Sequence, residues 1–139
     1  MTKDEAINVL SQGTHTGKLA TASESAKPHV APVWFIVDGR DLVFTTGSDS
    51  VKGRHLRANP SAALVVDDEQ FPYSFVSVGG AVSVVEQPAD LVTWTTRIAE
   101  RYVPAGQAEG YGRANSGPGN LLCRLRLEHI VGVRDVAAS

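Results

Sequence analysis

Residues 28–60 read PHVAPVWFIVDGRDLVFTTGSDSVKGRHLRANP, and this stretch decides the fold that we expect. Its first ten residues, 28–37, are rich in β-branched and aromatic side chains and predict a strand. Asp38-Gly39 is a pair typical of a tight hairpin turn, and residues 42–46 predict the returning strand. A short helix should follow and end at Asn59-Pro60, because proline disfavours helical backbone at the residue before it. The sequence therefore predicts a β-hairpin joined directly to a short basic helix.

The start of this helix has the features of an anion site. Backbone N–H groups at a helix start, beside hydroxyl groups and a cation, suit a phosphate or a carboxylate. A solvated helix face would explain Lys52 and Arg54 alone, but the hydroxyls of Thr45, Thr46 and Ser50 directly upstream favour anion binding. We therefore expect a phosphate-bearing cofactor lying across the hairpin.

The remainder of the chain predicts mostly strands. Thr2 and Glu5 have capping-box spacing, which predicts a short N-terminal helix that ends near Gly13. Further strands are expected at residues 17–22, 62–67, 72–86 and 121–128. Their order along the chain predicts a small antiparallel barrel rather than a parallel sheet.

Three further segments between residues 72 and 121 carry signals of their own. Gly79-Gly80 lies within a strand pattern and indicates a bulge or a close backbone approach. A second helix is expected where apolar residues recur at helical spacing. These residues are Leu91, Trp94, Ile98 and Tyr102. Residues 103–119 are rich in Gly, Pro and Ala, and we expect a loop there.

The overall composition limits the classes of function. The 139 residues predict one domain, 1–139, and the formal net charge of -2 argues against a general nucleic-acid binder. The single Cys excludes an intrachain disulfide, and no apolar run reaches the ~20 residues of a membrane span. The start of the sequence has no signal-peptide pattern, so we expect a cytoplasmic protein without a membrane partner.

Several reactive side chains have an ordinary structural explanation. The four histidines show no pair at metal-ligand spacing, so no metal site is expected. His29 differs from the others because it enters the hairpin that should contact a ligand. Cys123 lies on the apolar side of its strand, where a thiol is inert. Trp34, Tyr73 and Phe75 fit either the core or a face that stacks on a flat heterocycle.

Three segments together resemble a known family. They read PHVAPVWFIVDG, FTTGSDSVKGRHLRANP and PYSFVSVGGAVSV, and in this order they resemble the split-barrel superfamily of pyridoxamine-phosphate-oxidase-like proteins. The resemblance is closest to the branch of flavin- and deazaflavin-dependent oxidoreductases. It implies a mainly β fold, a six-stranded antiparallel split barrel of the FMN-binding type. It also implies a homodimer with cofactor sites at the subunit interface.

The resemblance also implies which residues bind the cofactor. The residues expected to edge its ring system are His29, Val30, Ala31, Pro32, Val33 and Trp34. Those expected to hold its phosphate are Thr45, Thr46, Ser50, Val51, Lys52 and Gly53. Arg54 should meet a second anionic group, and Tyr73 and Phe75 should approach from the partner subunit.

The implied function is that of an oxidoreductase dependent on coenzyme F420, which transfers a hydride to a small unsaturated organic substrate. One alternative is an FMN-binding oxidoreductase of the same fold. Another is a non-enzymatic module that binds a flavin or a tetrapyrrole. The C-terminal substrate arginine motif of the true pyridoxamine-phosphate oxidases is absent, since Arg124 and Arg126 do not reproduce it. No side chain stands out as a general acid, so the catalytic residues stay open.

Overall fold

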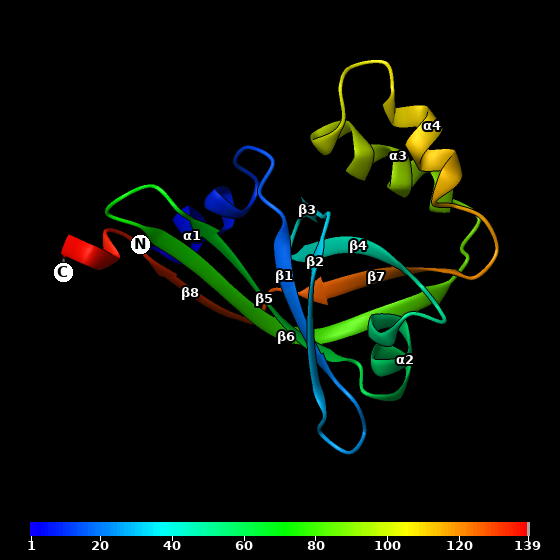
Figure 1. Cartoon of the computed structure of the whole chain (residues 1–139), viewed down its shortest axis with the longest axis horizontal. Coiled ribbons are helices and arrows are strands. Elements are labelled where there is room, and N and C mark those ends of the chain that lie inside the picture. Colours follow the sequence, from blue (N-terminus) through cyan, green and yellow to red (C-terminus); the bar gives the residue numbers. More distant parts are fainter. Residues whose placement is uncertain (139) are drawn as a thin grey trace.

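The computed structural model describes residues 1–138, and its centre is a strongly curved antiparallel β-sheet (Figure 1). The helices are α1 (Lys3–Leu10), α2 (Val51–Ala58), α3 (Leu91–Tyr102), α4 (Ala108–Ala114) and the short 3-10 helix Val136–Ala138. The strands are β1 (Gly17–Ala22), β2 (Pro28–Val33), β3 (Ile36–Asp38), β4 (Asp41–Gly47), β5 (Ser61–Asp68), β6 (Ser74–Glu86), β7 (Asn120–Arg126) and β8 (His129–Val133). Neighbouring strands follow the order β2-β1-β5-β6-β7-β4-β3, with β8 paired to β6. The mainly β, antiparallel split barrel is therefore confirmed, although the described residues form eight strands where we expected six.

The first extra strand arises because residues 28–37 do not form one strand. β2 pairs with β1, whereas β3 pairs with β4, so the chain crosses from one half of the sheet to the other between them. At the crossing, the backbone N–H of Phe35 donates to the Tyr102 hydroxyl at 3.2 Å. The Phe35 carbonyl accepts from Arg101 Nη1 at 2.9 Å. Helix α3 thus takes the backbone groups that a continuous ladder would have used.

The second extra strand is β8, which lies beyond the predicted strand at residues 121–128. β7 pairs with the second half of β6, and β8 pairs with residues Phe75–Gly79 of the first half. The chain turns between them at Leu127, whose N–H donates to the Arg40 carbonyl. The predicted strand is therefore confirmed as β7, and β8 is an additional strand that pairs with the other half of β6.

Strand β6 holds the two halves of the sheet together. Its first part pairs with β5 and β8, and its second part pairs with β7. The β5 ladder runs through Gly79 and Gly80 without a break. A side chain at Gly80 would overlap the backbone carbonyl of Arg126. Of the two alternatives for this glycine pair, the close backbone approach is confirmed.

Two hydrophobic clusters stabilise the curved sheet. The larger fills its concave side and includes Phe35, Phe44 and Leu125, all fully buried. The smaller packs α3 onto β4 and β7 through Val43 and Leu122. β4 is covered on both faces, which explains why its central residues form an uninterrupted apolar run. The predicted apolar stripe of α3 is confirmed, since Leu91, Trp94, Ile98 and Tyr102 all belong to this smaller cluster.

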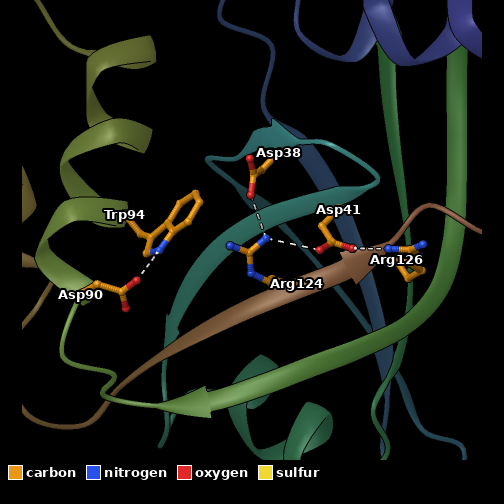
Figure 2. Close-up of polar contacts among 6 residues, drawn as sticks. All are labelled: Asp38, Asp41, Asp90, Trp94, Arg124 and Arg126. Carbon is orange, nitrogen blue, oxygen red and sulfur yellow. Dashed lines mark hydrogen bonds and ion pairs between the residues drawn. The ribbon is translucent and has the colours of Figure 1, made fainter.

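Polar contacts extend the junction between α3 and the sheet (Figure 2). Arg124 of β7 forms ion pairs with Asp38 at 3.0 Å and Asp41 at 3.3 Å, at the two ends of the β3–β4 turn. Its guanidinium lies 4.6 Å from the centre of the Trp94 ring, and the Trp94 indole N–H donates to Asp90. Arg124 of β7 thus connects α3 to the β3–β4 hairpin.

One local expectation about helices is confirmed, and one is wrong. The Thr2–Glu5 capping box is present, as expected. Ser50 caps α2 by accepting from the Gly53 N–H. Residues 103–119 are not all loop, because α4 forms within them. α4 is short and contains two glycines, so intrinsic propensity disfavours it. It forms because buried Gly112 lets it pack closely against Thr96 of α3. In residues 1–138 no helix has both the length and the apolar character needed to cross a membrane.

Candidate functional site

A cavity of about 400 Å³ lies where the β2–β3 crossing, β4 and the start of α2 face the pair α3–α4. From the hairpin and α2 it is lined by Pro32, Val33, Trp34, Thr45 and Lys52. From α3 and α4 it is lined by Thr95, Ile98, Ala99, Tyr111 and Asn115. Its volume is within the range of small-molecule sites. All five residues in the first group were expected at a cofactor site, and none in the second group was.

The start of α2 is organised by one hydroxyl group. Ser50 Oγ donates its proton to the Gly47 carbonyl at 2.7 Å and accepts from the Gly53 N–H at 3.0 Å. Thr46 Oγ1 lies 2.9 Å from Ser50 Oγ. The Thr46 hydroxyl must be the donor in this contact, because the Ser50 hydroxyl has already given its one proton to Gly47. Both hydroxyl protons are therefore used within the loop, and these two residues shape the helix start.

Gly53 lets α2 begin close to the end of β4. A Cβ at this buried position would overlap the carbonyl oxygen of Gly47. Any side chain at Gly53 would therefore push the first turn of α2 away from the loop that caps it. Arg57 Nη2 and Arg54 Nη1 brace the loop from the other side by donating to the Ser48 and Asp49 carbonyls at 2.9 and 3.2 Å.

The first turn of α2 leaves unpaired donors beside the cavity. The backbone N–H groups of Val51 and Lys52 have no acceptor within residues 1–138, as is usual at a helix start. The Lys52 ammonium, which lines the cavity, has no hydrogen bond or ion pair in this part of the chain either. Thr45 also lines the cavity and adds a hydroxyl. The arrangement can bind an anionic group through two N–H donors and one cation.

Trp34 forms the aromatic side of the cavity. Its ring stacks on Tyr102 with centres 5.0 Å apart and planes within 6°. The Tyr102 hydroxyl donates to the His15 carbonyl at 2.9 Å, and burial raises the pKa of this phenol, which keeps it protonated. Trp34 itself remains 38% exposed. One face of the indole is therefore held by the protein, and the rest is open to a ligand.

Arg101 stabilises the backbone next to Trp34. It donates to the Phe35 carbonyl and to the carbonyls of Leu10, Gln12 and Gly13 at the end of α1. Its guanidinium also lies 4.6 Å from the centre of the Phe35 ring. Burial lowers the pKa of Arg101, but the group keeps its charge because a guanidinium is far from neutral at ordinary pH.

The wall formed by α3 and α4 was missed by sequence reasoning. The Thr95 hydroxyl, which is buried, donates to the Gly112 carbonyl at 2.7 Å and so fixes α4 on α3. Tyr111 and Asn115 lie four residues apart, on the same face of α4, and both reach the cavity. The sequence held one usable signal for this wall, since Thr95 and Ala99 flank the apolar stripe of α3.

His29 lies beside α2 and outside the lining of the cavity. Its ring meets that of His55 edge-on, with centres 6.1 Å apart. Thr21 Oγ1 lies 3.0 Å from His55 Nδ1, whereas the buried His29 Nδ1 has no hydrogen-bond partner within the described residues. Val30 and Ala31 follow on the same strand, and Val30 is exposed. A role of these three residues in binding stays a prediction.

Tyr73 and Phe75 lie apart from the cavity. They line a separate hollow together with the acidic residues Asp67, Asp68 and Glu69. Within this chain they cannot contact a ligand in the cavity, so their expected role requires a second subunit. Cys123 is fully buried, and burial raises its pKa to about 12, so its thiol is an inert core group as expected.

The chain is similar to known proteins in both sequence and fold. Residues 4–128 match the family model described as pyridoxamine 5'-phosphate oxidase. No curated protein sequence matches the chain. A solved F420 reductase is 26% identical, with a TM-score of 0.68, covering 89% of this chain and 94% of that one.

Two further solved structures share the fold. A conserved hypothetical protein from Mycobacterium tuberculosis has a TM-score of 0.82 at 21% identity, covering 100% of this chain and 89% of that one. HutZ, the heme storage protein from Vibrio cholerae, has a TM-score of 0.72 at 19% identity, covering 94% of each chain. At these identities the likeness concerns the fold alone.

Proposed function

The chain belongs to the pyridoxamine 5'-phosphate oxidase family, and from this premise we propose that it is an oxidoreductase that uses coenzyme F420. In this proposal it transfers a hydride from the reduced cofactor to a small unsaturated organic substrate. The observation that carries the proposal is the unpaired Lys52 ammonium beside the free N–H groups of α2, on the wall of a cavity that also exposes Trp34. The F420 reductase with the same fold supports the choice of cofactor.

The residues present fit the phosphate of such a cofactor. The first turn of α2 offers the N–H groups of Val51 and Lys52 together with the Lys52 ammonium. Gly53 allows this turn to approach the Gly47 loop, and the Ser50–Thr46 pair holds the loop in place. The donor set contains no carboxylate, which would repel a phosphate.

The cofactor supplies the hydride chemistry, and the protein binds, orients and shields it. Lys52 and the start of α2 anchor the anionic end. Pro32, Val33 and Trp34 present a largely apolar edge to a ring system, and Trp34 is kept rigid by its stacking on Tyr102. Ile98 and Ala99 of α3 are buried and keep water from the opposite side of the cavity.

The distribution of charge favours F420 over FMN. F420 carries a phosphodiester and an acidic tail, whereas FMN ends in one dianionic phosphate. A tight FMN site calls for several converging cations, and Lys52 is the one charged residue among those that line the described cavity. Arg54 and Arg57 lie further along α2, are exposed, and form a basic track that suits an acidic tail.

We expect F420 to bind at least roughly tenfold more tightly than FMN, and the preference to shrink as salt rises. The tail contacts are exposed, so they are screened over about 8–10 Å at physiological ionic strength. Binding isotherms for both cofactors at low and high salt measure the preference. Equal or tighter binding of FMN at low salt would replace the F420 proposal with the flavin alternative.

The second candidate function is storage or transport of a flavin or tetrapyrrole without turnover. The observation that favours it is the shared fold with a heme storage protein. The absorption spectrum and mass of the chromophore retained by the purified protein separate the two candidates. A retained heme supports storage, whereas a retained deazaflavin that is first reduced chemically and is then reoxidised by an unsaturated acceptor supports catalysis.

We further propose that the protein is a homodimer whose interface includes β6 and the turn before it. Phe71 is 76% exposed and Tyr73 is 47% exposed in the isolated chain, and Val131 on the neighbouring β8 is exposed as well. In a dimer Tyr73 and Phe75 would reach the partner's cofactor site. Sedimentation velocity at micromolar concentration should give twice the mass of the chain, and Phe71→Glu should shift it toward the monomer. A wild-type protein that sediments as a stable monomer would exclude this arrangement.

A further inference from the structure

α4 forms a separately attached wall of the cavity. It packs mainly on α3, through the Thr95–Gly112 hydrogen bond and the close contact of Gly112 with Thr96. Figure 1 shows α3 and α4 together, standing above one end of the sheet. Tyr111 and Asn115 therefore face the β2–β3 crossing across the cavity, on the side opposite the expected ring edge.

The polar groups of this wall are free to contact a ligand. The Tyr111 side chain is 44% exposed, and its hydroxyl has no hydrogen bond within the described residues. Asn115 Nδ2 donates to the Tyr111 backbone carbonyl at 2.8 Å, which orients the amide and leaves its carbonyl oxygen unpaired in that part of the chain. The wall thus offers one hydroxyl donor and one amide acceptor, in a fixed relation set by a single turn of α4.

The aromatic groups favour a ligand with an apolar body. One face of Trp34 is covered by Tyr102, and the Tyr111 ring lies 6.1 Å from Trp34 at a tilt of 51°. The Trp34 and Tyr111 rings are therefore in tilted contact and do not stack on each other. Both rings remain partly exposed and line the cavity, so an apolar group in the cavity can contact them.

The charges of the cavity exclude one class of ligand. Lys52 is its charged lining residue, and no carboxylate lines it to receive a cation. If Lys52 holds the cofactor phosphate, the α4 side of the cavity contains only neutral groups. A cationic substrate would there lose its hydration without gaining a partner, which is unfavourable.

We propose that Tyr111 and Asn115 position the substrate, and that the substrate is an uncharged molecule with an apolar body and a carbonyl or similar acceptor oxygen. This inference rests on the proposed function, because it places the cofactor along the hairpin and α2 and the substrate against α4. Tyr111 donates a hydrogen bond to the acceptor oxygen, and Asn115 holds the α4 turn that presents the phenol. Both act as positioning residues.

The test uses protein loaded with oxidised F420, so that no hydride is available and binding is measured at equilibrium. The probes are acetylnaphthalene, ethylnaphthalene, which lacks the carbonyl, and the cation methylquinolinium. Tyr111→Phe should weaken acetylnaphthalene about three- to tenfold, the contribution of one hydrogen bond, and leave ethylnaphthalene unchanged. Wild-type protein should bind methylquinolinium at least roughly tenfold more weakly than acetylnaphthalene.

Arg113→Ala is the matched control, because Arg113 is exposed on α4 but does not line the cavity. It should leave both naphthalene affinities unchanged. The inference is overturned if Tyr111→Phe affects the two naphthalenes equally, if it weakens F420 itself, or if methylquinolinium binds as tightly as acetylnaphthalene. Failure of the wild-type protein to bind F420 is a different result, since it removes the proposed function on which the inference rests.

Discussion

Replacing Lys52 with alanine is expected to weaken cofactor binding roughly ten- to hundredfold. The change removes a charge-assisted contact worth about 1.5–3 kcal/mol, and no other cation lines the described cavity to replace it. The backbone N–H groups of α2 should remain in place, because Lys52 makes no contact that holds the helix start. Titration with F420, followed by the absorbance of the deazaflavin, measures the loss.

Two further variants define the role of this side chain. Lys52→Arg should recover part of the affinity, because a planar guanidinium keeps the charge but cannot occupy the place of a compact ammonium. Lys3→Ala removes a lysine of α1 that does not line the cavity, and the affinity should not change. An unchanged dissociation constant for Lys52→Ala would show that the phosphate binds elsewhere.

Replacing Arg101 with alanine is expected to lower the free energy of unfolding by about 3 kcal/mol. The guanidinium serves four backbone carbonyls, at the end of α1 and at Phe35. Without it, these carbonyls lose their charged donor, and α3 loses its link to α1. Urea denaturation at fixed protein concentration measures the change, because association would shift the midpoint.

Arg97 provides the matched control for this experiment. It lies four residues earlier on α3, is exposed, and contacts the Trp94 ring with its guanidinium 4.5 Å from the ring centre. Arg97→Ala should therefore cost only about 0.5–1 kcal/mol. If the two variants lose the same stability, the carbonyl contacts of Arg101 contribute little, and the β2–β3 crossing must be held by packing and by the Phe35–Tyr102 hydrogen bond.

The hairpin and the start of α2 could be predicted because their signals are local. The hairpin turns at Gly39 and Arg40, between the paired residues Asp38 and Asp41, which is one residue later than the Asp38-Gly39 pair alone suggests. Gly39 has a φ of +61°, which glycine adopts without strain. Ser50 caps α2 three residues later at Gly53, which is a contact within one turn. Such features depend on neighbouring residues, so the sequence alone was sufficient for them.

The crossing between β2 and β3 and the helix α4 could not be predicted in this way. Residues 28–37 have a continuous strand pattern, and only Arg101 and Tyr102, far along the chain, reveal why it breaks at Phe35. α4 has poor helix propensity and exists because Gly112 packs on α3. Both depend on tertiary contacts that a single sequence does not display.

Some residues of the candidate site could be predicted from the sequence, and others could not. Pro32, Val33 and Trp34 come from one segment, and Thr45 and Lys52 follow soon after it, so the family resemblance could place them together. Tyr111 and Asn115 reach the cavity only because α4 packs on α3. The side of the cavity formed by the hairpin and α2 was therefore visible in the sequence, and the opposite wall was not.

Because both halves of the sheet share strand β6, we expect the chain to unfold cooperatively. β6 pairs with β5 and β8 through residues 74–81 and with β7 through residues 82–86, so one continuous strand belongs to both halves of the sheet. The two halves should therefore unfold in one concerted transition and not as independent units. A ligand held at the α2 end of the sheet then stabilises the distant β8 end as well, by an amount that grows with the ratio of free ligand to its dissociation constant.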